Sequence, residues 1–172
     1  MKIHIGMRKM KSLMALTLAF AVWQIVRIFL PTLSPHPIFA YIYSVVEIRE
    51  TVDKTKRTSR LRVKATFIGL IVGLIFIFLS YYVTSMIRSE MWSTAAELFF
   101  ILLATLVALI AAEQFKCETF CGIAAIIPII CMVSHNEEDI YFYAIMRVFQ
   151  TFIGIFSALL INGLIKRKDP PA

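Results

Sequence analysis

Long apolar stretches alternate with short polar ones along the whole chain. A helix of about 20 apolar residues is long enough to cross the hydrocarbon core of a bilayer. The stretches that meet or approach this length are residues 12–30, 38–48, 65–87, 95–112, 119–134 and 140–165. No segment alternates with the period of two expected of a membrane β-strand. The pattern therefore predicts an all-α, polytopic membrane helical bundle with six transmembrane helices.

The second and fifth stretches are irregular. The second, residues 38–48, is short and follows Pro35 and Pro37, and the fifth contains Gly122 and Pro128. Residues 38–48 could form a re-entrant segment, but this would place the strongly basic segment after it outside the cell. We therefore expect both stretches to cross the membrane.

Fifteen of the 18 Lys and Arg residues lie in four places: residues 2–11, 49–64, Lys116, and 166–168. The intervening polar segments, near 31–37, 88–94 and 135–140, contain only one, Arg88. Cytoplasmic loops of membrane proteins are enriched in Lys and Arg. The charge pattern thus predicts that both termini are cytoplasmic.

Composition narrows the class of protein further. The chain is 59% hydrophobic and 17% charged, whereas soluble domains average about 45–50% and about 25%. We expect one integral membrane domain, residues 1–172, with no soluble appendage. The net charge of +7 is interpreted as contact of the 49–64 basic loop with anionic lipid headgroups, and not as nucleic-acid binding.

Two segments share a motif of Arg, Thr and small residues. They are Arg62-x3-Thr66-x2-Gly69-x3-Gly73 and Arg147-x3-Thr151-x2-Gly154-x3-Ala158. When the sequence separation between the two motifs is shortened by four residues, Phe39 and Ile42 match Phe120 and Ile123. The hypothesis is an internal repeat of three helices (about 5–87 and 95–165), which an odd number of crossings inverts in the membrane. Chance similarity between apolar helices is the alternative.

Several polar residues fall inside the predicted helices. A charged side chain at the bilayer centre costs about 2.5–3.5 kcal/mol on insertion scales. In inverted-repeat transporters, interrupted middle helices line the substrate pathway. The candidate pathway residues are therefore Gln24, Arg27, Glu47, Pro128, Arg147, Gln150, Thr151, Gly154 and Asn162.

Each charged candidate has an alternative role. Arg27 and Arg147 could form a cationic cavity for an anion, or extend to the headgroups. Glu47 is the best candidate for a buried carboxylate, and otherwise an interfacial acid paired with a nearby arginine. For Thr66, Gly69 and Gly73 we expect helix packing.

Catalytic and cofactor sites have no support in the sequence. Cys117 and Cys121 share a helical face, but no His or further Cys lies nearby in the sequence, so they are interpreted as packing residues. There is no Ser-His-Asp set, HExxH motif or phosphate-binding glycine loop. We expect neither an enzyme nor a bound cofactor.

Three segments resemble the fusaric acid resistance-like (FUSC) superfamily, specifically its short bacterial aromatic acid exporter branch. They are Ile5-Gly6-Met7-Arg8, the Arg62 to Gly69 segment, and Tyr143 to Asn162. Ala65 replaces the glycine usual in the second. The resemblance implies six helices, a bacterial plasma-membrane location, a homo-oligomer (a dimer favoured), and export of aromatic or other organic anions. The alternative function is a non-transporting membrane scaffold or accessory subunit for cell-envelope assembly.

Overall fold

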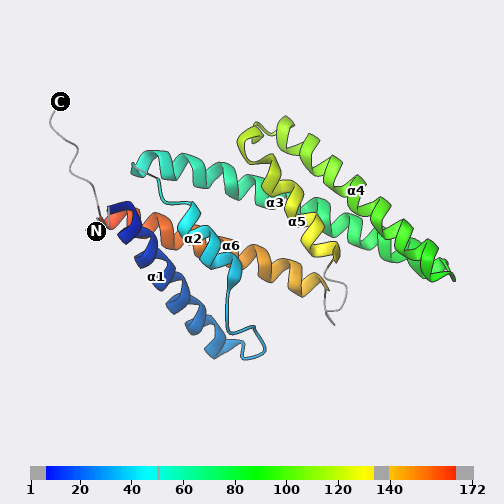
Figure 1. Cartoon of the computed structure of the whole chain (residues 1–172), viewed down its shortest axis with the longest axis horizontal. Coiled ribbons are helices and arrows are strands. Elements are labelled where there is room, and N and C mark those ends of the chain that lie inside the picture. Colours follow the sequence, from blue (N-terminus) through cyan, green and yellow to red (C-terminus); the bar gives the residue numbers. More distant parts are fainter. Residues whose placement is uncertain (1–6, 50, 134–139, 166–172) are drawn as a thin grey trace, which may run out of the picture. The chain divides into compact units, whose positions relative to one another are not determined.

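The computed structural model describes residues 7–49, 51–133 and 140–165. Within these ranges every regular element is helical (Figure 1). The elements are α1 (Met7–Phe29), α2 (Ile38–Val46), α3 (Val52–Met86), α4 (Glu90–Gln114), the short 3-10 helix η1 (Glu118–Phe120), α5 (Cys121–Val133) and α6 (Ile140–Leu164). The all-α prediction is confirmed. The cations at 2 and 166–168, Ile5-Gly6 of the first family motif, and most of the 135–140 segment lie outside the described residues.

Four of these helices, α1, α3, α4 and α6, are long and apolar enough to cross a membrane. The chain is thus a multi-pass membrane protein. The middle helices are much shorter: α2 has 9 residues and α5 has 13, which corresponds to about 13 Å and about 20 Å of helix. Whether α2 and α5 also cross stays a prediction.

The basic segment 49–64, expected to be a loop, is helical from Val52 onward, so that prediction is wrong. Thr51 stabilises the helix start, because its Oγ1 accepts a hydrogen bond from the Lys54 backbone N–H at 3.4 Å. Asp53 in the first turn complements the helix dipole. Lys and Arg also have good helix propensity, so a run of cations continues a helix as readily as it forms a loop.

The chain divides into two compact units. Unit 1 comprises residues 1–60 and 149–172, and unit 2 comprises residues 61–148. Helices α3 and α6 each contribute one part to unit 1 and the other part to unit 2.

In unit 1, α1 packs against α2. The buried face of α1 carries Ala15, Ala19 and Trp23, one residue every helical turn. Pro31, Pro35 and Pro37 prevent the chain from continuing as a helix, and α2 begins directly after Pro37. The Trp23 indole N–H donates a hydrogen bond to the Ser34 carbonyl at 2.9 Å, which fastens this turn to α1.

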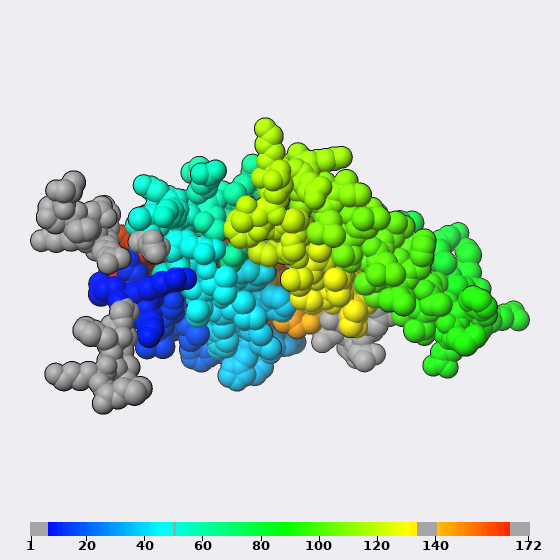
Figure 2. All heavy atoms as spheres, turned by 45° about the horizontal axis from the view of Figure 1, so that its top comes forward, coloured from blue at the N-terminus to red at the C-terminus, as the bar shows by residue number. Residues whose placement is uncertain are grey.

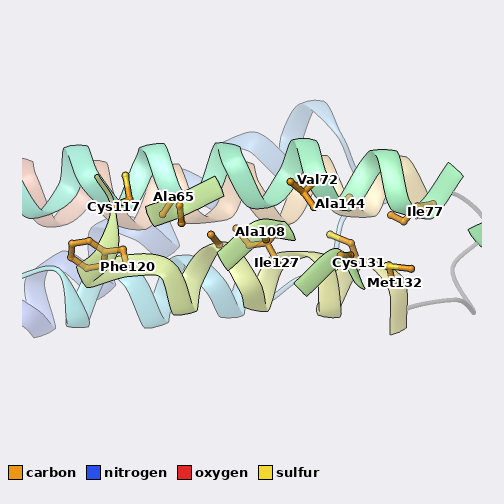
Figure 3. Packing of buried hydrophobic residues seen from close by; sticks show 13 residues of the cluster. Ala65, Val72, Ile77, Ala108, Cys117, Phe120, Ile127, Cys131, Met132 and Ala144 are labelled. Carbon is orange, nitrogen blue, oxygen red and sulfur yellow. The ribbon is translucent and has the colours of Figure 1, made fainter. Parts of the chain in front are cut away.

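In unit 2, α4 packs against α5 through Ala104, Ala108 and Ala112, which are again one turn apart. These alanines join a larger apolar cluster from α3, α5 and the start of α6, shown in Figure 3. The opposite face of α4 exposes large apolar side chains. Part of the surface formed by α4 is visible in Figure 2, in green. That distribution suits a helix with one face toward protein and the other toward lipid tails.

The end of α4 contains an unusual backbone conformation. Lys116 has a φ of 57°, in the left-handed region, where glycine is usual. The Lys116 N–H donates to the Glu113 carbonyl and the Cys117 N–H donates to the Ala112 carbonyl, at 2.9 and 2.8 Å. These two bonds form a Schellman motif, which ends α4 and turns the chain toward α5.

Candidate functional site

Four of the predicted pathway residues lie on α6 within unit 1. Gln150, Thr151 and Asn162 are buried in a helix that is otherwise strongly apolar. Gly154 lies against α2, since a Cβ placed there would be 2.6 Å from the Ala40 carbonyl oxygen. The absence of a side chain at Gly154 therefore lets α6 approach the α2 backbone.

Asn162 is the centre of a buried hydrogen-bond network. Its Oδ1 accepts a hydrogen bond from the Lys11 ammonium at 2.7 Å. Its Nδ2 donates to Thr55 Oγ1 at 2.7 Å and to the Arg49 carbonyl at 3.3 Å. The Arg49 N–H in turn donates to Thr55 Oγ1 at 3.2 Å. One amide thus joins α1, the α2–α3 connection, α3 and α6.

Glu47, at the end of α2, is fully buried. Its Oε1 accepts a hydrogen bond from the Ser59 hydroxyl at 2.8 Å. Ser59 and Thr55 are one turn apart on α3 and are both buried. Glu47 and Asn162 are therefore bonded to adjacent turns of the same helix.

Gln24 and Arg27 contact the turn between α1 and α2. The Gln24 amide donates to the Pro35 carbonyl at 3.2 Å, and Arg27 Nε donates to the Leu33 carbonyl at 3.2 Å. Arg27 also donates to Gln24 Oε1 at 3.0 Å. Like Trp23, Gln24 and Arg27 donate hydrogen bonds to backbone carbonyls of the turn, so both stabilise its structure. Their predicted role in a substrate pathway stays a prediction.

The motif arginines both contact aromatic rings in unit 2. Arg147 donates a hydrogen bond to the Tyr143 hydroxyl, and its guanidinium carbon lies 4.3 Å from the centre of the Tyr143 ring. The Arg62 guanidinium carbon lies 5.0 Å from the centre of the Phe120 ring. Both distances are within the range of cation–π attraction.

Gly69 and Gly73 pack against α5. A Cβ at Gly69 would lie 2.6 Å from the Ala124 carbonyl oxygen, and one at Gly73 would lie 3.3 Å from Pro128 Cα. Pro128 has no N–H, so it cannot donate the helical hydrogen bond to the Ala124 carbonyl. The Ala124 carbonyl, which lies beside Gly69, therefore lacks the usual helical hydrogen bond.

Several buried polar atoms have no hydrogen-bond partner within the described part of the chain. In unit 1 they include Gln150 Oε1 and Ser157 Oγ, and in unit 2 Thr66 Oγ1 and Ser80 Oγ. Gln150, Gly154 and Ser157 share one face of α6, at steps of four and three residues. The face of α6 that contacts α2 at Gly154 therefore carries a buried polar side chain one turn before that glycine and another one turn after it.

The structure therefore brings together some of the predicted residues and adds others. Glu47 and Asn162 belong to the network of unit 1, whereas Pro128 and Arg147 belong to unit 2. Lys11, Thr55 and Ser59 were missed by sequence reasoning. Thr55 and Ser59, four residues apart and flanked by cations, carry the pattern of a small polar helix face.

The buried polar groups of unit 1 thus include an ammonium, an amide and a carboxylate, those of Lys11, Asn162 and Glu47. No group of three or more His, Cys, Asp or Glu side chains suited to a metal ion occurs among the described residues.

Comparison with known proteins identifies the family. No curated protein and no solved structure matches the chain. The family model described as aromatic acid exporter family member 1 matches residues 3–165, which is nearly the whole chain. The match agrees with the resemblance seen in the three sequence segments and with the apolar helices. The chain belongs to the aromatic acid exporter family.

Proposed function

We propose that the protein exports small organic anions, aromatic carboxylates first among them, across a bacterial plasma membrane. Family membership supports the substrate class. The observation that carries the proposal is the buried polar face of α6, where Gln150 Oε1 and Ser157 Oγ have no partner among the described residues. Inside a bilayer, a polar atom needs a partner from the protein or from a water-filled cavity. A hydrated path along this face would supply that partner.

We further propose that, within unit 1, the path is lined by Glu47 of α2 and by Gln150, Thr151, Gly154 and Asn162 of α6, with Gln24 and Arg27 near its outer end. Within unit 2, we propose Pro128 of α5 and Arg147 of α6 as substrate-contacting residues. The short middle helices, α2 with 9 residues and α5 with 13 residues including Pro128, support this proposal, because short or proline-containing helices form substrate sites in repeat-built transporters.

The internal repeat is part of the proposal, and equivalent contacts support it. Gly69 and Gly154 hold the same place in the repeated motif, and a Cβ placed at either would lie 2.6 Å from an alanine carbonyl oxygen. Those alanines are Ala124 and Ala40. The side chains that also lie close to the two glycines, Ile127 and Tyr43, each follow the contacted alanine by the same step along the helix. This register differs from the one expected from matching Phe39 with Phe120.

The membrane arrangement follows from the same proposal. Six crossings, including α2 and α5, would place both termini in the cytoplasm, with three helices per inverted repeat. The exposed cations at the start of α3 would meet anionic headgroups on that side. They are Lys54, Lys56, Arg57, Arg60 and Lys64. Assembly as a homo-oligomer, a dimer first, is proposed from the family resemblance.

Transport is tested by reconstitution. Liposomes that contain the purified protein and are loaded with radiolabelled benzoate are expected to release it faster than protein-free liposomes do. Arg147→Ala is expected to slow release, because it removes the guanidinium beside Tyr143. Release equal to that of protein-free liposomes would reject the exporter. Stable co-purification with a larger membrane partner would then favour the scaffold function.

A further inference from the structure

The turn between α1 and α2 is held by three side chains from the last two turns of α1. Trp23, Gln24 and Arg27 each donate a hydrogen bond to a different backbone carbonyl of this turn. Two bonds fix the Arg27 guanidinium: Nε donates to the Leu33 carbonyl at 3.2 Å, and one terminal nitrogen donates to Gln24 Oε1 at 3.0 Å. Neutral groups therefore hold the guanidinium plane in one orientation.

The positive charge of Arg27 is not offset by an acid in the described part of the chain. No carboxylate there forms an ion pair with Arg27, and the two bonds above are its only hydrogen bonds there. Because a guanidinium has five N–H donors and two are used, three have no acceptor among the described residues. A planar group with several such donors can bind two oxygens of one phosphate or carboxylate.

Arg27 lies at one end of a helix that is long and apolar enough to cross a membrane. α1 has 23 residues, or about 34 Å of helix, which is close to the hydrocarbon thickness of a bilayer at about 30 Å. The exposed cations Arg8 and Lys9 are in its first turn, and Arg27 is in its last turn. Each end of α1 is therefore expected at a membrane surface, where lipid phosphates lie.

Exposed apolar side chains follow Arg27 on α1 and continue on α2. Ile28 and Phe29 are 78% and 79% exposed. Ile38 and Ile42, one turn apart on α2, are also exposed. In a membrane protein, exposed apolar side chains face acyl chains. A ligand of Arg27 is thus expected to combine an anionic head with apolar chains.

We propose that Arg27, held by Gln24 and the Leu33 carbonyl, binds the phosphate of an anionic phospholipid, whose acyl chains cover the exposed side chains of α1 and α2. An anionic head is favoured over a zwitterionic one, because choline or ethanolamine would bring a second cation near the guanidinium. A small aromatic acid has the anionic head but no long chains. The inference goes beyond the proposed export function and does not depend on it.

Within unit 1, this site is separate from the basic start of α3. Thr55 of α3 is linked through Asn162 to Lys11, near the start of α1. Residues 11 and 27 of one helix are about 24 Å apart along its axis. A probe beside Arg27 therefore reports lipid at that site and not lipid bound by the cations of α3.

Trp23 provides that probe, because it is one turn from Arg27 and the chain contains one other tryptophan, Trp92. The experiment places the full-length Trp92→Phe protein in phosphatidylcholine bilayers with increasing fractions of phosphatidylglycerol that carries brominated acyl chains. Bromine quenches the fluorescence of a nearby indole. Quenching is expected at lower phosphatidylglycerol fractions than random mixing gives, with a preference of about fivefold for one basic side chain at the membrane surface.

Two substitutions in the Trp92→Phe background test the charge of Arg27. Arg27→Gln is expected to reduce the preference to that of random mixing. Arg88→Gln is the matched control, because it removes the same charge from an exposed position between α3 and α4, and it is expected to change nothing. Arg27→Lys loses the planar donor group but keeps the charge, and is expected to retain at least a twofold preference.

Random mixing around Trp23 in the Trp92→Phe protein would overturn the proposal. So would the same preference in Arg27→Gln and Arg88→Gln. Loss of the preference in Arg27→Lys would show that Arg27 only holds the turn, and this result decides the matter if Arg27→Gln does not fold.

A further arm separates the lipid from the exported acid. Benzoate added to the same bilayers is expected to leave Trp23 quenching unchanged. Relief of the quenching by benzoate would assign the site to the acid and overturn the lipid proposal. The proposed export function is tested separately by release from liposomes, so the failure of either proposal can be recognised without the other.

Discussion

At the scale of single residues, two glycines set how closely helices approach. The hypothetical Cβ atoms at Gly69 and Gly154 would each lie 2.6 Å from a backbone carbonyl oxygen. A backbone atom within a packed helix cannot move aside as the end of a flexible side chain can. Neither glycine has a positive φ, so these positions require glycine for space and not for backbone conformation.

Alanine substitutions at these glycines are therefore expected to destabilise the protein. Gly69→Ala and Gly154→Ala should each lower the free energy of unfolding by about 1–3 kcal/mol, the usual range for overpacking. Gly122→Ala and Gly163→Ala are the controls, since a Cβ at either position meets nothing within 4 Å. Denaturation in mixed micelles measures all four. Equal stability of the two pairs would show that the close approach is not required.

Sequence reasoning identified these two glycines because a repeated spacing marks them. It did not identify Lys11, which lies among four cations that all fit the charge rule for cytoplasmic segments. Burial of one of those four depends on Asn162, 151 residues away in the sequence. The residues around Lys11 in the sequence therefore do not allow its contact with Asn162 to be predicted.

At the scale of helices, α3 differs most from expectation. Its apolar stretch begins near residue 65, but the helix begins at Val52. The first turns are amphipathic: Thr55, Ser59 and Arg62 are buried, and the cations between them are exposed. Apolar periodicity cannot detect a helix whose buried face is polar, which is why this part was assigned to a loop.

The polar face of α3 is expected to stabilise unit 1 through Thr55. Thr55→Val keeps the shape of the side chain but removes the acceptor for the Asn162 amide and the Arg49 N–H. Leaving buried donors without an acceptor should cost about 1–3 kcal/mol of unfolding free energy. Thr58→Val is the matched control, because that hydroxyl donates only to the Lys54 carbonyl of its own helix among the bonds described.

Thermal unfolding in detergent compares the two threonine variants. The expected result is a clearly lower midpoint for Thr55→Val than for Thr58→Val. Indistinguishable midpoints would mean that the Asn162 network contributes little to the stability of unit 1.

The bounds of α2, α5 and α6 lie within two residues of those predicted, whereas α3 begins 13 residues earlier than predicted. Pro35 and Pro37 act locally, by removing N–H donors and fixing φ, so the start of α2 can be predicted from the sequence. The expectation that Pro128 breaks the fifth stretch is wrong, because α5 runs as one helix from Cys121 to Val133 with Pro128 inside it. The register between middle helices was not predictable in the same way. The register depends on which backbone carbonyl lies against each glycine, Ala124 for Gly69 and Ala40 for Gly154. Matching Phe39 with Phe120 in the sequence predicts a different register.

At the scale of the whole molecule, the proposal requires α2 to cross the membrane. Thr32→Cys, before α2, and Lys56→Cys, after it, are expected to lie on opposite sides. The test uses a background in which Cys117, Cys121 and Cys131 are serine. An impermeant maleimide added to intact cells should label position 32 and not position 56. Labelling of both positions, or of neither, would indicate that α2 enters and leaves on one side.

The two units bury different polar groups. Unit 1 buries Lys11, Glu47 and Asn162, whereas unit 2 buries Arg62, Thr66 and Ser80 beside its apolar cluster. Under the proposed function, substitutions at the buried polar residues of unit 1 are expected to affect transport most.

Benzoate efflux from proteoliposomes is the most direct test of the account, with Gln150→Leu compared against Gln114→Leu. Gln150 is on the buried polar face of α6, and Gln114 is exposed at the end of α4. The account predicts efflux well above that of protein-free liposomes, a loss of at least tenfold in Gln150→Leu, and no change in Gln114→Leu. Efflux equal to that of protein-free liposomes, or the same rate in both variants, would contradict it.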